Sequence, residues 1–151
     1  SYPSATVVGP SSAAAKNRAL KCHLELDADS FQSAIPECEV IKLDGCPFLD
    51  ESVLFHRPTG SLIGADLLIS ACAKDHFTWR WAARITGCYE KVCVPPDVRS
   101  RTRPSDATAR AIDRMTSLPL KRILVAHCDP IVERPAAQLA EAWQFSGATR
   151  R

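Results

Sequence analysis

Short apolar runs separated by turn residues predict several β-strands in this chain. One run ends at Asp44-Gly45, which is a turn signal. Two later runs are separated by a short segment that contains Pro58 and Gly60, and this pattern predicts a β-hairpin. The expected strands are residues 5–8, 22–26, 40–43, 51–56, 61–66 and 122–127.

Helical spacing of apolar residues predicts helices between and after these strands. Gly87 is placed to end the first long helix, and Ser105 is placed to cap the next. Pro119 stops that second helix, and Pro135 suits the first turn of the last one. A further short helix is expected at residues 29–34. The apolar positions that carry the helical spacing are Phe77, Trp81, Ala82 and Ile85, then Ile112, Met115 and Leu118, then Leu139 and Trp143.

The order of these elements indicates the fold class. Strands come first, helices follow, and a later strand returns after a helix, which favours a mixed α/β layer over an all-helical bundle. The length of 151 residues and the 46% of apolar residues suit one domain over residues 1–151, with a frayed tail at 146–151. Residues 11–20 are expected to be a loop or one helical turn. Because no run of 18 apolar residues occurs, no membrane span is expected.

The net charge of +2 conceals a basic middle third of the chain. Its densest part holds Arg99, Arg101 and Arg103 between proline residues. If this segment is extended, the three guanidinium groups point to one side and could contact phosphate or an acidic partner. The alternative is a solvated loop. Nucleic acid is not favoured as a partner, because no aromatic platform or helix pattern accompanies the arginines.

Seven cysteines occur, and none of them forms a C-x-x-C pair. Zinc-ribbon spacing is therefore absent from the sequence. Several of the cysteines lie beside apolar residues, where a free thiol behaves as a small hydrophobic group. Free thiols favour a reducing intracellular compartment, either the cytoplasm or an organelle such as the mitochondrion, over secretion.

Two polar residues at the ends of predicted strands are candidate metal ligands. Asp66 ends the 61–66 run, and His127 ends the 122–127 run. A carboxylate and an imidazole are suitable ligands for zinc, manganese or iron, but a catalytic metal needs about three protein ligands. The alternatives are a turn acceptor for Asp66 and a hydrogen-bonded strand end for His127.

The segment 51–68, together with 123–127, resembles an uncharacterised family of metallo-beta-lactamase-like domains. The resemblance extends back through 2–5 and 45–48 and forward to the last helix. It implies part of an αββα sandwich, with two sheets between helices. It also implies that Asp66 bridges two metal ions and that His127 binds one of them.

The same resemblance places the family's His-x-His-x-Asp-His ligand cluster upstream of Ser1, and no such cluster occurs in this sequence. The resemblance also implies a further ligand histidine just before the strand that starts at Glu51, and residues 45–50 contain no histidine. We therefore expect a C-terminal portion of such a domain, acting as a non-catalytic structural or interaction subunit in a larger assembly, with no cofactor by default. A protein partner would cover its exposed sheet face. The alternative is a metal-dependent hydrolase that uses zinc or iron and whose N-terminal half lies outside this chain.

Other polar and aromatic candidates have simpler interpretations. His56 is expected to make a turn hydrogen bond, because no motif places a nucleophile for it to activate, and His23 and His76 suit surface or capping roles. Trp79 falls off the helical face that Trp81 shares with Phe77, so these rings form either an aromatic docking patch or a core with one partly exposed ring.

Overall fold

The computed structural model describes residues 4–10, 13, 22–26 and 29–147 of the chain. Its main sheet has the strand order β3-β4-β5-β6, with two antiparallel pairs followed by one parallel pair. The mixed α/β class is therefore confirmed. The strands of this sheet are β3 (Cys38–Lys42), β4 (Ser52–His56), β5 (Ser61–Ile63) and β6 (Arg122–Leu124), and a 3₁₀ turn, η1 (Arg57–Thr59), joins β4 to β5.

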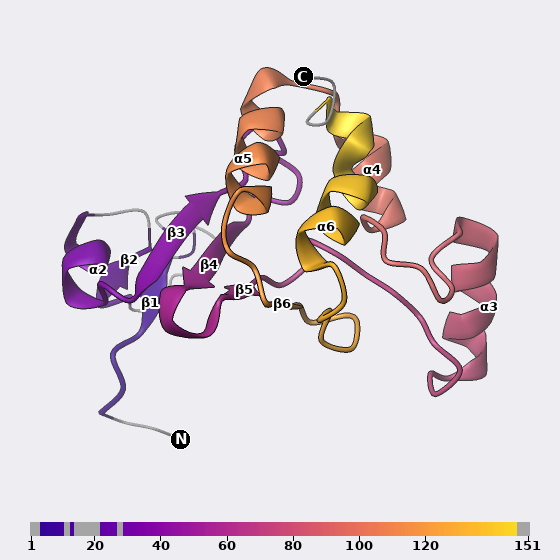
Figure 1. The fold of residues 1–151 in the computed structure, drawn as a ribbon, viewed down its shortest axis with the longest axis horizontal. Helices are drawn as coiled ribbons and strands as arrows, with labels where there is room; N and C mark the ends of the chain where they lie inside the picture. The colour runs from indigo at the N-terminus through magenta and orange to yellow at the C-terminus, as the bar shows by residue number, and fades with distance from the viewer. Residues whose placement is uncertain (1–3, 11–12, 14–21, 27–28, 148–151) are drawn as a thin grey trace.

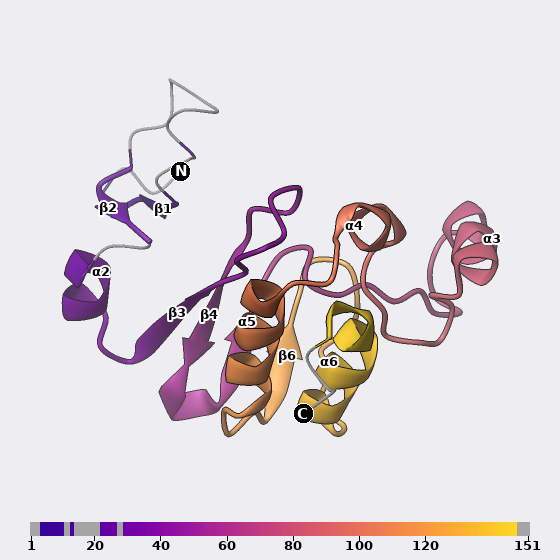
Figure 2. The ribbon, with the colours of Figure 1, turned by 90° about the horizontal axis from the view of Figure 1, so that it is seen from above.

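The helices stand mainly on one face of this sheet. Figures 1 and 2 show α5 and α6 side by side over the sheet, with α3 at the far end of the molecule beyond α4. A parallel pair of short strands, β1 and β2, lies at the opposite end together with α2. The bounds are β1 (Val8–Gly9), β2 (Leu24–Glu25), α2 (Asp29–Ala34), α3 (Phe77–Thr86), α4 (Pro96–Arg101), α5 (Asp106–Thr116), α6 (Pro135–Trp143) and the 3₁₀ turn η2 (Gln144–Ser146).

The main core lies between the sheet and the two helices that cover it. Cross-strand partners align Phe55 with Leu62, and Leu62 with Ile123, on the inner face. Met115 of α5 and Trp143 of α6 are fully buried in the same cluster. Burying one such side chain stabilises the fold by about 1.5–3 kcal/mol. The sheet and these two helices therefore form the rigid body of the molecule.

The outer face of the sheet carries a second apolar row. The strand register aligns Val40 with Leu54, Leu54 with Ile63, and Ile63 with Leu124. Ile63 is 40% exposed, and the other three are half-buried. None of the four belongs to either of the two buried clusters of the described residues. An apolar stripe therefore crosses the whole sheet on the face opposite the core.

The local signals for the helix ends are confirmed. Gly87 ends α3 with φ of 77°, and its N–H donates to the carbonyl of Ala83. The hydroxyl of Ser105 accepts the N–H of Thr108 at 3.1 Å, which caps α5. Pro135 occupies the first turn of α6, as expected.

Several predicted strands extend too far. The 5–8 run is a strand only from Val8, and the 22–26 run only at Leu24 and Glu25. The 61–66 run leaves the ladder after Ile63, and the 122–127 run leaves it after Leu124. After Ile63, the carboxylate of Glu51 accepts the backbone N–H groups of Ala65 and Asp66, which are thus lost to strand pairing. Each polar residue consequently lies on a loop that follows its strand.

The arginine segment is helical, so the condition for a one-sided row of guanidinium groups, an extended chain, is not met. Pro96 is the first residue of the helix α4, where a helical turn accepts proline, and Pro95 precedes it as the N-cap residue. The Arg99 guanidinium lies 5.3 Å from the ring centroid of Phe145, whereas the Arg101 guanidinium lies 4.1 Å from that of Phe48. Arg99 and Arg101 therefore contact different aromatic side chains, and Arg103 follows the end of the helix. The three arginines do not form the single-sided stripe that an extended strand would give.

The cysteines are not all free thiols. Cys88 and Cys93 form a disulfide, while the other five are free, so the expectation is wrong for this pair. The carbonyl of Cys88 accepts a backbone hydrogen bond from the N–H of Ala71, and the N–H of Cys93 donates to the carbonyl of Ile69, so both cysteines are held beside the segment 69–71.

The tail prediction is wrong at its first residue. Ser146 is 1% exposed, and its hydroxyl donates to the carbonyl of Trp143 at 2.7 Å. Residues 148–151 lie outside the described residues, as do residues 11–20 apart from residue 13. Within the described part of the chain, no helix has both the length and the apolar character that crossing a bilayer requires.

Candidate functional site

Asp66 and His127 lie together at one edge of the sheet. They follow β5 and β6, and because these strands are parallel their carboxyl ends meet at the same edge. The Nε2 atom of His127 lies 2.9 Å from Oδ1 of Asp66. The side chains are 55% and 50% exposed, respectively. The pair is therefore accessible from solvent.

Glu51 fixes the loop that carries Asp66. Its Oε2 atom accepts the N–H of Asp66 at 3.2 Å, and its Oε1 atom accepts the N–H of Ala65. Burial raises the pKa of the Glu51 carboxyl, and these two N–H bonds oppose that effect. A Cβ atom at Gly64 would lie 2.7 Å from Oε1, so glycine leaves room for this contact. The sequence analysis did not identify Glu51, and its only signal was an acidic residue at the start of an apolar strand.

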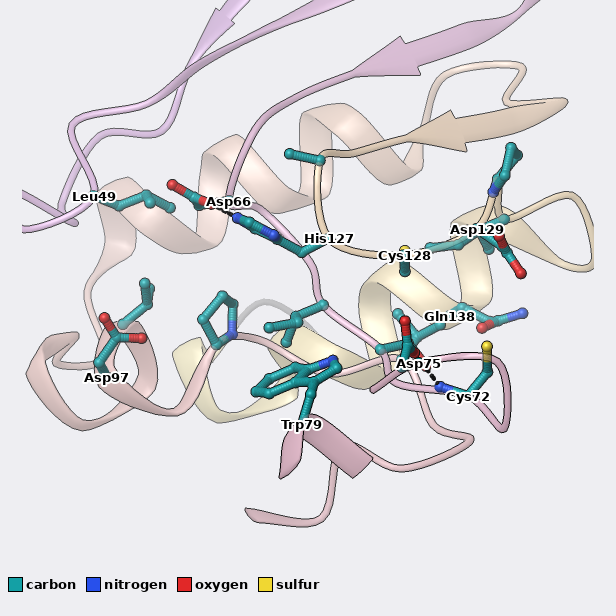
Figure 3. A pocket seen from close by; sticks show the side chains of 18 of the residues that line it. Leu49, Asp66, Cys72, Asp75, Trp79, Asp97, His127, Cys128, Asp129 and Gln138 are labelled. Atoms are coloured by element: carbon teal, nitrogen blue, oxygen red, sulfur yellow. Dashed lines mark hydrogen bonds and ion pairs between the residues drawn. The ribbon is translucent and has the colours of Figure 1, made fainter. Parts of the chain in front are cut away.

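A cleft of about 1140 Å³ opens beside the Asp66–His127 pair. Figure 3 shows Asp66 and Asp97 toward one end of it, Asp75 and Asp129 toward the other, and Trp79 between the two ends. Segments that are distant in sequence meet here, since the lining comes from the loop after β3, from the loop after β5, from α3 and α4, and from the loop before α6. The remaining labelled residues are Leu49, Cys72, Cys128 and Gln138.

The lining of the cleft is acidic. Among the described residues that form it there is no lysine or arginine. The Asp75 carboxylate accepts the N–H of Cys72 at 2.7 Å, and Asp129 lies 3.8 Å from Lys74. The carboxylate-bearing residues of the cleft are Asp66, Asp75, Asp97, Asp129 and Glu133. Such a lining creates a negative potential that attracts cations.

The residues present do not form a complete metal centre. Asp66 and His127 supply two donors, and the described residues contain no group of three or more His, Cys, Asp or Glu placed to hold an ion. Cys128 follows His127, but burial raises the pKa of its thiol and Asp129 raises it further, which disfavours the thiolate that would bind a metal. A catalytic metal needs about three protein ligands. The two residues that the sequence predicted are thus together, and the part of the chain that the structure describes places no third ligand beside them.

The other histidines have local partners. The Nδ1 atom of His56 lies 2.8 Å from the Thr59 hydroxyl, which confirms the expected turn hydrogen bond. The His76 Nδ1 atom lies 2.8 Å from the Thr78 hydroxyl at the start of α3. His23 accepts the N–H of Val7 at 2.9 Å. These histidines satisfy local polar groups of the chain.

The aromatic residues of α3 are divided between two faces of the helix. Trp79 is half-buried and lines the cleft, while Ala83, one turn later, is fully buried. Phe77, Trp81 and Ile85 are 70%, 69% and 67% exposed. Positions four apart share a helical face, so these three form one apolar stripe that points away from the core. The interpretation of a core with one partly exposed ring is wrong here, because two rings are exposed.

Comparisons with known proteins found no relative of this chain. No family model matches it, and neither the curated proteins nor the solved structures give a significant match. The candidate site is therefore interpreted from its own geometry.

Proposed function

We propose that this chain is a non-catalytic interaction subunit, derived from a metallo-beta-lactamase-like hydrolase, whose outer sheet face packs against another protein in a larger assembly. The observation that carries the proposal is the in-register apolar row formed by Val40, Leu54, Ile63 and Leu124. Most pairs of this sheet are antiparallel, and where such a sheet leaves one face to water, that face is normally polar rather than apolar. Here the helices α5 and α6 cover only the inner face (Figure 2).

The chemistry of this row specifies the kind of partner. The row has a branched aliphatic side chain on every strand of the sheet, and Ile63 near its centre is 40% exposed. Side chains on facing sheets interdigitate at a spacing of about 10 Å. A second apolar sheet or an apolar helix face would suit this surface. The resemblance to an αββα sandwich favours a sheet as the covering layer. The five free thiols favour an intracellular compartment for the assembly, and the disulfide between Cys88 and Cys93 opposes it.

The proposal is tested by placing a charge within the row. Ile63→Lys adds a cation at the centre of the outer face, and Gln144→Lys adds the same charge at an exposed position on η2. The tagged wild-type chain and each variant are expressed in the source cells and purified with any stoichiometric partner. That partner is then purified by itself, and its affinity for each form is measured by calorimetry.

We expect the wild type and Gln144→Lys to bind the purified partner equally, and Ile63→Lys to bind it at least tenfold more weakly, because a desolvated charge faces an apolar surface. Circular dichroism and a urea midpoint check that Ile63→Lys is folded. Equal affinity of all three forms contradicts the proposal. A wild-type chain that is purified as a stable monomer without a stoichiometric partner contradicts it as well.

A metal-dependent hydrolase is the second candidate, favoured by the convergence of Asp66 and His127 at the cleft. It requires further ligands from residues outside the described part of the chain or from another chain. If the full-length protein carries stoichiometric zinc or iron, and His127→Ala removes it, the hydrolase replaces the non-catalytic subunit as the better proposal. Elemental analysis of both forms decides between them.

A further inference from the structure

The cleft beside the Asp66–His127 pair has apolar walls in addition to its acidic ends. Phe48 and Val132 are 43% and 60% exposed, and both line the cleft. Trp79 lies between the two acidic ends (Figure 3). Apolar side chains gathered at a hollow surface are typical of a place where another molecule binds. The apolar side chains of the walls therefore favour a ligand whose central part is apolar.

The acidic residues define what the ends of such a ligand must carry. Asp66 and Asp97 lie at one end of the cleft, and Asp75 and Asp129 at the other (Figure 3). A cation at each end would meet carboxylates, whereas an anion at either end would be repelled. Charge complementarity thus selects a ligand with two cationic groups on either side of its apolar part.

Two of the carboxylates that line the cleft have no partner in the described part of the chain and are available for such a ligand. The side chains of Asp97 and Glu133 make no hydrogen bond or ion pair with the described residues, and both are exposed. Two basic residues contact side chains that line the cleft. Lys74 lies 3.8 Å from Asp129, and the guanidinium of Arg101 stacks over Phe48. The negative charge of the lining is therefore only partly balanced by the chain itself.

The size of the cleft indicates the class of ligand. Sites for small molecules enclose about 300–1,000 Å³. This cleft, at about 1140 Å³, is larger than that range. It is also open to solvent along the exposed Val132 and Phe48. A polypeptide segment fills such an open groove better than a small metabolite does.

We propose that this cleft binds a segment of a partner protein in which Lys or Arg residues flank apolar side chains. This inference rests on the proposed function, because the bound segment belongs to a partner protein. It concerns a different surface, however, since the outer row of the sheet and the cleft share no residue. The two proposals can therefore fail separately.

The test uses a defined peptide on the full-length chain. The probe is an acetylated and amidated Lys-Leu-Phe-Leu-Lys peptide, with a Glu-Leu-Phe-Leu-Glu peptide and spermidine as comparisons. Calorimetry at low and high salt gives the affinities. We expect the Lys peptide to bind one chain, to bind less tightly as salt rises, and to bind more tightly than spermidine, while the Glu peptide does not bind.

Matched variants locate the site. Asp97→Asn with Glu133→Gln removes two cleft carboxylates, whereas Asp113→Asn with Glu37→Gln removes two exposed carboxylates elsewhere. Both pairs change the net charge equally. We expect the cleft pair to weaken binding of the Lys peptide at least fivefold and the control pair to leave it within twofold.

Each contrary outcome overturns a stated part of the inference. Equal weakening by both pairs indicates non-specific attraction by net charge and removes the site. Spermidine binding as tightly as the peptide makes the cleft a small-amine site and removes the polypeptide ligand. If the purified partner needs Ile63 but binds the cleft variant normally, the interaction role remains and only this inference fails.

Discussion

The imidazole Nε2 atom of His127 lies 2.9 Å from the carboxylate Oδ1 atom of Asp66, so two residues far apart in sequence form one polar pair. The pair exists because β5 and β6 are parallel neighbours and the loops after both strands leave at the same edge. The loop of Asp66 is held by Glu51, and the backbone of His127 accepts the N–H of Ser70 at 3.2 Å. The arrangement is therefore fixed by backbone contacts.

Breaking this pair should have little effect on stability. In Asp66→Asn and in His127→Ala the polar contact is weakened or lost, but both side chains are about half exposed and water replaces the lost partner. We expect the free energy of unfolding to fall by less than about 1 kcal/mol. Urea denaturation of each single variant and of the double variant measures this. A loss several times larger would indicate that the pair has a structural role.

The sequence predicted this pair because a polar residue that ends a long apolar run is a strong local signal. It did not predict the cleft, whose lining comes from segments that only the tertiary fold brings together. Glu51 was missed for a related reason. Its partners are two backbone N–H groups on a distant loop, and a backbone donor has no signature in the sequence.

The prediction of secondary structure succeeded where local chemistry decides it. The bounds of α2 match residues 29–34, and the caps at Gly87 and Ser105 are in place. It failed where tertiary contacts override local preference. Alternating arginines suggested an extended segment, but the guanidinium groups stack on Phe145 and Phe48, and Pro96 is accommodated in the first turn of α4.

The buried carboxyl of Glu51 should make stability depend on pH. Because burial raises its pKa above the ordinary 4.5, the folded state binds this proton more tightly than the unfolded state does. The stabilisation is complete below the ordinary value and is lost as pH rises through the higher folded-state pKa. Glu51→Gln removes this dependence, since an amide does not titrate. We therefore expect the stability of Glu51→Gln, relative to that of the wild type, to increase as pH rises from the ordinary pKa of the carboxyl through its higher folded-state pKa.

Urea midpoints of the wild type and Glu51→Gln, measured at a series of pH values, check this prediction. Glu37→Gln is the control, because Glu37 is exposed and its amide variant should parallel the wild type. Curves for Glu51→Gln and wild type that stay parallel from acidic to neutral pH would show that Glu51 does not titrate differently in the folded protein.

Two tryptophans in different environments provide a matched test of the core. Trp143 is fully buried, and its Nε1–H donates to the carbonyl of Leu67 at 3.2 Å, whereas Trp81 is 69% exposed. Trp143→Phe leaves a small cavity and an unpaired carbonyl, so we expect a loss of about 2–3 kcal/mol. Trp81→Phe should change stability by less than about 0.5 kcal/mol. Equal losses in urea denaturation would contradict the packing of α6.

Removing the disulfide should destabilise the region of α3 and leave the main core unchanged. Cys88 and Cys93 close a short loop directly after this helix, so Cys88→Ser with Cys93→Ser should cost about 2 kcal/mol or less. The loss should be local, because Ala83 and Cys88 belong to a small cluster separate from the main core. Hydrogen exchange is expected to speed up over residues 77–93 and to remain unchanged in β4. Thiol titration of the denatured, unreduced protein should find five free thiols of seven.

The exposed stripe on α3 should be removable without loss of the fold. Phe77, Trp81 and Ile85 are each about two-thirds exposed or more, and together they offer roughly 400 Å² of apolar surface. That is about half of what one partner contributes to a stable interface, so the stripe by itself is too small to hold a dimer. Replacing all three with Ser should therefore leave the urea midpoint and the mass in solution the same as those of the wild type but reduce the binding of an apolar fluorescent dye. If the triple variant unfolds instead, the stripe packs against the chain itself, and α3 lies differently from the arrangement described above.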